Sequence, residues 1–401
     1  MDISASSEYF SVNVGEARLV PPATPTPQEF KSLSKVDAQV CIRHHIPFVH
    51  FYPPSRSSSS RDPVEVIKMA LSRALVHYYP LAGRLRNEGM DGKLVVDCCG
   101  EGVIFREANA DITLEKLRRI NGDLRPPFPL WERFLVDDVW GGNFITDSPL
   151  LRMQVTRLAC GGFVLAYTCN HCACDTYGAF QFITAVSDFS RDPHRKDPSI
   201  LPSWGREALS SRSPSTRSML SHREELHIAD NDEAHHNLTK TYFKTFDETS
   251  VFLSNAEIAL LKKQVFFPFD TRFRYEHDLS KGFYGNTAVV SCATAKASEL
   301  VDKPLKSDTN KVFCQKEAFI VSDVRWFRFR EVDFGWGQAS YAGPARAGIG
   351  LLPGMLTSLL CHKTSDGVEG LLALVSLPPM FTKMFHREVR REIMGGLLSA
   401  L

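Results

Sequence analysis

Residues 150–189 read LLRMQVTRLACGGFVLAYTCNHCACDTYGAFQFITAVSDF, and this stretch decides the fold. Two apolar runs, 150–158 and 163–171, are joined through a Gly-Gly pair, which is typical of a β-hairpin. From about Thr176 onward the large apolar residues recur at helical spacing. The stretch therefore predicts two strands, a short turn and a helix, with a histidine and an aspartate in the turn.

Similar patterns continue on both sides of this stretch. Apolar residues at helical or alternating spacing define each further element, and Gly, Pro or polar clusters separate them. These elements are a helix over 64–79, short strands at 93–97 and 103–105, a helix opened by a capping box at 254–257 and reaching Gln264, a hairpin over 356–377, and a C-terminal helix after Pro379. Together they predict a mixed α/β fold.

The chain is long enough for more than one domain. It has 401 residues, of which 43% are hydrophobic, and a single core rarely serves so long a chain. Between residues 203 and 241 the composition changes to Ser, Arg, His, Asp and Asn with few large apolar residues. We therefore expect one domain over 1–202, a crossover linker over 203–241 and a second domain over 242–401.

Charge and cysteine usage limit the partners and the compartment. Lys and Arg number 47 against 46 Asp and Glu, which argues against nucleic acid or an anionic membrane as a partner. Residues 1–10 lack the pattern of a signal peptide, and the best apolar run, 370–377, is only strand-sized. The ten cysteines are scattered without a disulfide framework. We expect a cytoplasmic protein with no membrane span.

His171 and Asp175 form the only His-x-x-x-Asp in the first half of the chain. A histidine at a strand end can project its imidazole into a cleft, where the neutral ring accepts a proton from a hydroxyl or an amine near physiological pH. In the alternative interpretation, His171 is a packed side chain and Asp175 only caps the following helix. The pair alone leaves both interpretations open.

A zinc site is a third interpretation of the same turn. Cys169, Cys172 and Cys174 crowd around His171, and thiolates with imidazole are common zinc ligands. Structural zinc sites usually draw a second ligand pair from a separate segment, and the chain has no such Cys-x-x-Cys or His-x₃-His. We therefore expect no metal.

A second motif, Asp333-Phe-Gly-Trp-Gly337, lies far downstream of His-x-x-x-Asp. The chain resembles the plant BAHD acyltransferases, which carry these two motifs in this order. Further familiar segments are Leu19–Pro27, Tyr79–Arg84, Val96–Gly102, Gln154–Leu158, Gly282–Asn286 and Val321–Val324. Within the family, the Pro-Thr-Pro opening and the Gly-Gly hairpin look most like the branch of benzyl alcohol O-benzoyltransferases.

The resemblance implies two domains similar to chloramphenicol acetyltransferase with a channel between them. It implies that His171 is the general base that moves an acyl group, benzoyl or acetyl, from CoA thioester onto a small alcohol or an amine. Acyl-CoA would be a co-substrate, with no permanently bound cofactor. By the same analogy the enzyme is a monomer.

The resemblance also assigns roles to single residues. Asp175 would pair with Arg272 of the second domain and so fix the turn, while the rival role is that Asp175 orients the imidazole as in a catalytic triad. Trp336, with Asp333, Gly335 and Gly337, would support the site structurally, although an indole N–H could also act as an oxyanion donor. The expected CoA contacts are Tyr341, Gly343 and Pro344.

The chain departs from the family pattern in two places. A buried helix expected between Gln264 and Phe266 is missing, and a helical stretch between Leu305 and Phe319 is shortened. Loss of a core helix exposes apolar surface, so the alternative function is an impaired or non-catalytic relative that binds a ligand or partner. Two competing functions are N-acylation and hydrolysis of the thioester by water.

Overall fold

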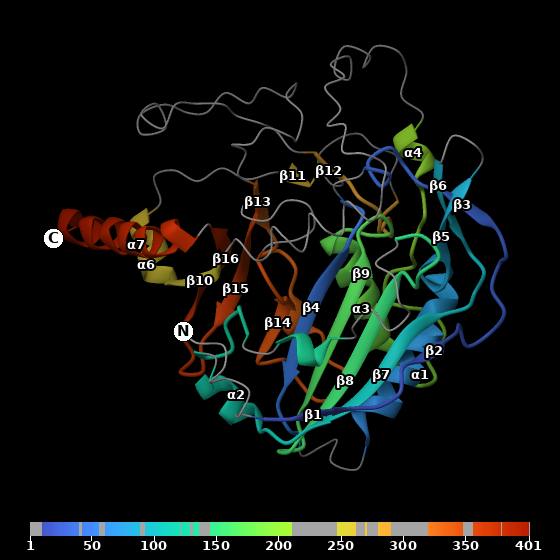
Figure 1. Ribbon diagram of the computed structural model, residues 1–401, viewed down its shortest axis with the longest axis horizontal. Coiled ribbons are helices and arrows are strands. Elements are labelled where there is room, and N and C mark those ends of the chain that lie inside the picture. Colours follow the sequence, from blue (N-terminus) through green and yellow to red (C-terminus); the bar gives the residue numbers. More distant parts are fainter. Residues whose placement is uncertain are drawn as a thin grey trace.

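The computed structural model describes residues 10–39, 42–55, 61–88, 93–120, 122–128, 131–135, 145–210, 247–261, 269–270, 280–289, 320–347, 356–377 and 379–400. Within these residues the chain forms two larger β-sheets that lie next to each other, with helices packed on them (Figure 1). The mixed α/β class predicted from the sequence is confirmed.

The first sheet contains the predicted hairpin at its centre. β8 (Leu151–Leu158) and β9 (Phe163–Asn170) pair antiparallel, as the Gly-Gly junction indicated. The full strand order is β1 (Val12–Val14), β7 (Val103–Ala110), β8, β9, β4 (His45–Tyr52) and β14 (Tyr341–Pro344), with β2 (Arg18–Val20) also paired to β7. The middle of this sheet leads directly to His171.

Both faces of the central strand β9 are buried. Its odd-numbered side chains, from Phe163 to Cys169, share a core with α1 (Pro63–His77) and α3 (Thr176–Arg191). Side chains alternate along a strand, so Val164 and Ala166 point the other way, into a second core. A strand covered on both faces holds its end rigidly, which suits it to carry a functional residue.

The second sheet is built from the C-terminal half. Its order is β10 (Asp247–Ser254), β16 (Glu369–Leu377), β15 (Leu356–Lys363) and β13 (Ile320–Asp323). The predicted capping box is formed, because Ser254 N–H donates to Glu257 Oε2 over 2.7 Å at the start of α6 (Asn255–Leu261). The predicted helix end at Gln264 lies outside the described residues. α7 (Pro379–Ala400) packs beside α6 and β10 (Figure 1).

One strand of the C-terminal half joins the sheet of the N-terminal half. β14 pairs antiparallel with β4, so that Tyr341 faces Phe51 and Pro344 faces Phe48. The second core likewise mixes residues of both sheets, including Leu372. The expected boundaries at 202 and 242 stay a prediction, and the two halves they define share a sheet and a core.

Shorter elements complete the described chain. They are β3 (Phe30–Ser32), η3 (Tyr79–Ala82), β5 (Arg84–Glu88), β6 (Lys93–Asp97), α2 (Leu114–Ile120), η4 (Trp131–Phe134), α4 (Glu207–Ser210), β11 (Phe269–Asp270), β12 (Ala288–Val289) and η8 (Phe329–Glu331). Strands β3, β6 and β5 form a small sheet of their own. Within the described ranges, no helix has the length and apolar character that crossing a membrane requires.

Candidate functional site

His171 follows β9 directly and precedes α3, in the turn that the sequence predicts. Its backbone N–H donates to the carbonyl of His44 over 2.8 Å, and the two imidazoles meet edge to face with centroids 5.3 Å apart. The His171 side chain is half-buried. The strand end therefore presents an imidazole that is enclosed on one side and still reachable.

The turn after His171 is shaped by its own polar groups. Asn170 Oδ1 accepts from Cys172 N–H over 3.0 Å, and Asn170 O accepts from Ala173 N–H over 2.9 Å. Asp175 Oδ1 then accepts from Gly178 N–H over 2.9 Å and caps α3. A short Asn or Asp side chain that binds nearby N–H groups favours a turn and a helix start over a continued strand.

Electrostatics keep the imidazole of His171 neutral. Burial lowers its pKa, because a charged imidazolium loses hydration in an enclosed site, and this effect outweighs the nearby Asp175 carboxylate, which raises the pKa. A histidine with a pKa below its usual value is neutral at physiological pH, so one of its two ring nitrogens has a free lone pair. It can therefore accept a proton from a bound alcohol or amine.

Asp175 does not form a triad with His171 in this geometry. Its Oδ1 serves the N-terminus of α3, whereas the buried Nδ1 of His171 has no hydrogen-bond partner among the described residues. A triad carboxylate would accept a hydrogen bond from that nitrogen. The favoured partner, Arg272, lies outside the described residues, so the Asp175–Arg272 pair stays a prediction.

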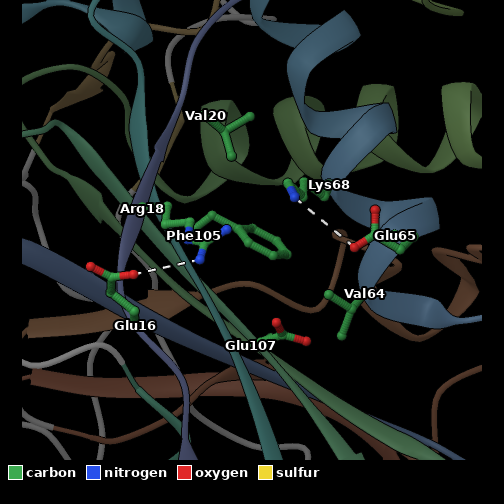
Figure 2. A pocket seen from close by; sticks show the side chains of 8 residues that line it. All are labelled: Glu16, Arg18, Val20, Val64, Glu65, Lys68, Phe105 and Glu107. Carbon is green, nitrogen blue, oxygen red and sulfur yellow. Dashed lines mark ion pairs between the residues drawn. The ribbon is translucent and has the colours of Figure 1, made fainter.

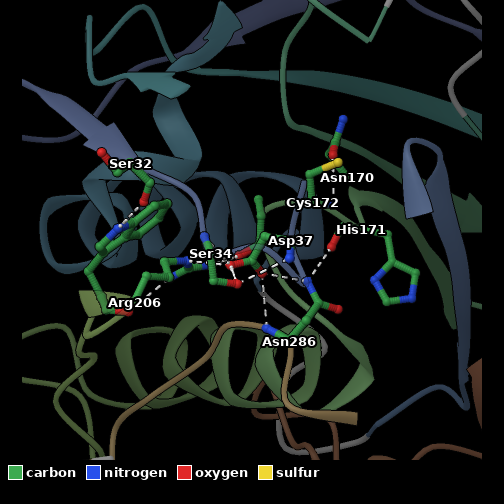
Figure 3. A network of polar contacts seen from close by, with 10 residues as sticks. Ser32, Ser34, Asp37, Asn170, His171, Cys172, Arg206 and Asn286 are labelled. Atoms are coloured by element: carbon green, nitrogen blue, oxygen red, sulfur yellow. Dashed lines mark hydrogen bonds and ion pairs between the residues drawn. The ribbon is translucent and has the colours of Figure 1, made fainter. Parts of the chain in front are cut away.

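Three buried residues that the sequence did not single out surround the turn. Asn286 Nδ2 donates to the His171 carbonyl and also to Asp37 Oδ1, each over 2.7 Å. Arg206 donates to the Ala173 carbonyl over 2.5 Å and forms an ion pair with Asp37 at 3.3 Å. Figure 3 shows this network beside His171.

Two signals in the sequence could have pointed to this network. The spacing Ser34-x-x-Asp37 is that of a self-bonded polar turn, and Asp37 Oδ2 indeed accepts from Ser34 N–H over 3.0 Å. In the sequence, the Gly-rich segment 282–286 carries only a resemblance to the family. Its closeness to the turn explains Gly178, where any β-carbon would overlap the carbonyl of Tyr284.

The second motif forms a self-capped loop. Asp333 Oδ1 accepts from the N–H groups of Gly335 and Gly337, each over 2.7 Å, and both glycines have a positive φ. Trp336 is 5% exposed and meets Phe163 edge to face at 5.3 Å. Glycines permit the left-handed conformations that the loop needs, and the indole fills a gap in the core.

This loop lies at the opposite end of β9 from the turn. Phe163, which contacts Trp336, opens the strand, and His171 follows its last residue. Eight residues of strand at about 3.3 Å each place the two ends roughly 25 Å apart. The structure therefore does not bring Trp336 to the imidazole. This distance favours the structural role over the role of the indole as an oxyanion donor, and the structural role stays a prediction.

The predicted CoA contacts lie inside the protein. Tyr341, Gly343 and Pro344 are all buried in β14, and Tyr341 is 1% exposed. The Tyr341 hydroxyl donates to the Pro344 carbonyl over 2.6 Å, and its ring packs on Phe128 with centroids 5.1 Å apart. Tyr341 is thus a core side chain, and the expected contacts of Tyr341, Gly343 and Pro344 with CoA stay a prediction, which this burial does not favour.

The cysteines near His171 face each other and the backbone. Cys169 Sγ and Cys174 Sγ lie 2.8 Å apart, and Cys172 Sγ lies 3.7 Å from the Ile42 carbonyl, which its thiol donates to. In the part of the chain that the structure describes, no group of three or more His, Cys, Asp or Glu side chains could hold a metal ion.

A shallow cavity of about 60 Å³ lies elsewhere, between β2, β7 and α1 (Figure 2). Its lining includes the buried side chains of Phe105 and Val64 and the ion pairs Arg18–Glu16 and Lys68–Glu65, whose side chains are exposed. None of the residues around His171 lines this cavity, so it is not part of the candidate site.

The described fold matches solved acyltransferases. The structure of vinorine synthase aligns with a TM-score of 0.64 at 20% identity and covers 93% of this chain and 96% of that one. TRI101 of F. sporotrichioides, solved with coenzyme A and T-2, aligns with a TM-score of 0.56 at 17% identity over 88% and 95% of the two chains. The fold is similar to that of chloramphenicol acetyltransferase.

The sequence comparison then defines the family. Residues 10–265 match the model of the Transferase family, and the chain belongs to this family, the BAHD acyltransferases. A benzyl alcohol O-benzoyltransferase of Petunia hybrida is 36% identical over 98% of this chain and 96% of its own. A (Z)-3-hexen-1-ol acetyltransferase of Arabidopsis thaliana is 34% identical over 95% and 94%. The protein is an acyltransferase for groups other than aminoacyl groups.

The same comparison confirms that the chain is shortened. The alignment with the Petunia relative spans 455 positions, which is 54 more than the 401 residues of the chain. At least that many positions of the alignment therefore have no counterpart here. The two sites where we predicted the losses, near 264–266 and 305–319, lie outside the described residues.

Proposed function

We propose that the protein transfers an acyl group, benzoyl or acetyl, from CoA thioester to a small alcohol, with His171 as the general base. The observation that carries the proposal is the His171 imidazole itself. It is half-buried at the end of a rigid strand, and burial lowers its pKa so that the ring is ready to accept a proton. The family and its alcohol-acylating relatives support the same chemistry.

The reaction needs only one proton carrier. His171 Nδ1 is enclosed, so we assign Nε2 as the nitrogen that takes the alcohol proton while the oxygen attacks the thioester carbonyl carbon. A carbon–oxygen bond forms, the tetrahedral intermediate collapses, and the carbon–sulfur bond breaks with its electron pair on sulfur. The thiolate takes the proton from the imidazolium, which restores the neutral base.

Two effects account for the rate. A positioned base contributes about 10²- to 10⁴-fold. Holding thioester and alcohol side by side makes the attack effectively unimolecular, which contributes further. A channel between the lobes, a monomeric state and a cytoplasmic location belong to the proposal as predictions.

Release of CoA thiol tests the proposal. Purified protein is incubated with benzoyl-CoA or acetyl-CoA, with and without benzyl alcohol, and free thiol is measured. Release that depends on the alcohol supports the transferase, and release without the alcohol supports thioester hydrolysis. Replacing benzyl alcohol by benzylamine separates O-acylation from N-acylation.

A second candidate function is ligand binding without turnover. It is favoured by one observation, the loss of at least 54 positions relative to the Petunia enzyme. In that case benzoyl-CoA binds, as measured by calorimetry, but no thiol is released with any alcohol. Turnover at an ordinary rate together with a single cooperative thermal transition excludes this candidate.

A further inference from the structure

We propose that Asp37, Arg206 and Asn286 are positioning residues that set the place of the His171 imidazole. The inference rests on the proposed role of His171 as the base. It starts from the turn 171–175, whose carbonyl groups are bound by side chains from distant parts of the chain.

Two carbonyls of the turn are fixed in direction. Asn286, which lies 115 positions away from His171, donates its Nδ2 hydrogen to the His171 carbonyl over 2.7 Å. Arg206, 33 positions from Ala173, donates to the Ala173 carbonyl over 2.5 Å. A carbonyl held by a donor fixes its peptide plane, and the planes on either side of a Cα atom set the direction of the side chain. Asn286 therefore holds the peptide plane that follows His171, and the His171 N–H that donates to the His44 carbonyl holds the plane before it. Arg206 acts further along, because it holds the turn two residues after His171.

Asp37 aligns the two donors. Its Oδ1 accepts from the backbone and side-chain N–H groups of Asn286, over 3.2 and 2.7 Å. Its Oδ2 accepts from Ser34 N–H and Oγ, over 3.0 and 2.5 Å, and from Arg206 Nε over 3.3 Å. Asp37 is 0% exposed. A fully satisfied buried carboxylate of this kind leaves its partners little freedom to rotate.

Packing confines the guanidinium of Arg206 to one slot. Its Cζ lies 3.4 Å from the centroid of the Trp204 ring, and Gly285 also lies against the guanidinium. A β-carbon on Gly285 would come within 2.9 Å of that Cζ atom, so glycine is required there. A planar, stacked guanidinium holds its N–H donors in fixed directions. The flexible ammonium of lysine does not hold its donors in this way, so it cannot replace the arginine.

The three residues act through His171 and not on the substrate. Asp37, Arg206 and Asn286 are 0%, 1% and 3% exposed, so they are enclosed by protein. Figure 3 shows the His171 carbonyl turned toward Asn286 while the imidazole points away from the network. Stability alone is a weak reason for a buried ion pair, because apolar side chains of similar volume often stabilise a core as well. Positioning gives the pair a function.

The decisive variant is Asn286→Ala, which removes the donor to the His171 carbonyl. We expect kcat per folded molecule to fall about tenfold to a hundredfold, with KM for the acyl-CoA changed by less than about twofold. Hydrogen–deuterium exchange in residues 171–178 should become faster, because the amides of the turn lose their fixed frame. Arg206→Lys, which keeps the buried positive charge, should give the same pattern more weakly and serves if Asn286→Ala does not fold.

Asp188→Asn is the matched control. Like Asp37, Asp188 is a buried carboxylate, and its Oδ2 accepts from Ser199 N–H and Oγ over 2.7 and 2.6 Å. It lies on α3, near the end of the helix that is far from His171. This variant should lower the melting temperature while leaving kcat and the exchange of residues 171–178 unchanged. A purely structural role for Asn286 predicts the same result for both variants.

The outcomes separate this inference from the proposed function. If the parent protein releases no thiol with any donor and alcohol, the proposed function fails, and the exchange of residues 171–178 in Asn286→Ala still decides whether the network positions the turn. If the parent is active, and Asn286→Ala and Arg206→Lys both keep parental kcat and parental exchange, the inference is overturned while the proposed function stands.

Discussion

The turn 171–175 and the loop 333–337 lie at opposite ends of β9. They differ in which residues form hydrogen bonds with their backbone polar groups. The turn depends on outside help, because Asn286 and Arg206 bind its carbonyls. The loop supports itself, because Asp333 binds two of its own N–H groups and Trp336 is buried. The difference predicts that the loop supports the fold and that the turn serves the chemistry, so the two motifs should respond differently to substitution.

The largest effect is expected from His171→Ala. Loss of the base should lower kcat about 10²- to 10⁴-fold. Because the side chain is only half-buried, the melting temperature should stay near that of the parent. Thiol release at saturating acyl-CoA and alcohol measures the rate, and a thermal scan measures the fold. Parental activity in a folded His171→Ala protein would contradict the role of His171 as the base.

Trp336→Ala should have the opposite profile. Removing a buried indole that contacts Phe163 should lower the free energy of unfolding by about 3–5 kcal/mol, through lost contacts and a cavity. Denaturant unfolding gives this number, and kcat is then measured on the folded fraction at low temperature, where it should match the parent. Trp336→Phe is the control, with a smaller loss. A large fall in kcat for folded Trp336→Phe would contradict a structural role.

Acidic pH should lower the stability of the fold near the loop end of β9. Burial lowers the pKa of His50 to about 3, and its Nδ1 lies 3.3 Å from the Tyr52 hydroxyl, which donates to Val332 next to the loop. In the unfolded chain the pKa of His50 is near 6.5, so the unfolded state binds the proton first as the pH falls. The stability is thus complete above about pH 6.5 and decreases below it, by about 2 kcal/mol at pH 5.

The variant His50→Gln isolates this effect. It removes the titrating group, so the drop in unfolding free energy between about pH 7 and about pH 5 should shrink by about 2 kcal/mol relative to the parent. Denaturant unfolding at both pH values measures the difference. An equal drop in variant and parent would show that His50 is not the group responsible.

A smaller effect is expected from Asp333→Ala. The variant leaves the N–H groups of Gly335 and Gly337 without their acceptor, which should lower the free energy of unfolding by about 1–2 kcal/mol. Asp333→Asn keeps an oxygen at the same place and should lose less. Thermal unfolding compares the two. Loss of activity in both variants at full stability would place the loop in the reaction after all.

The smallest effect is expected from Tyr341→Phe. The hydroxyl donates to the Pro344 carbonyl inside the core, so its removal should lower the free energy of unfolding by about 1 kcal/mol. Because the side chain is buried, KM for the acyl-CoA should not change. Steady-state kinetics with varied acyl-CoA measures it, and a raised KM would restore the expected CoA contact.

Local patterns predicted much of the fold. The hairpin of β8 and β9, the start of α3 and the capping box at Ser254 all follow from spacing and turn residues within about ten positions. Pairings between distant segments could not be predicted in this way. Nothing in the residues of β14 indicates that its partner is β4, because the pattern of a strand does not name its neighbour.

The same limit applies to the site. His171 was found because the strand–turn–helix context is local. Asp37 was missed because its partners Arg206 and Asn286 are 169 and 249 positions away, and a single aspartate in a polar turn is a common feature of any sequence. The order of the two signature motifs in the sequence also gave no information on the distance between them in the fold. The structure places them at opposite ends of β9.

The pairing of β14 with β4 has a consequence for how the protein is made. β4 leaves the ribosome within the first 52 residues, whereas its neighbour on that side is not synthesised until residue 344. During most of translation, one edge of the central sheet therefore stays unpaired, with apolar side chains that invite association with other chains. This edge of β4 acquires its partner only when residues 341–344 have been added.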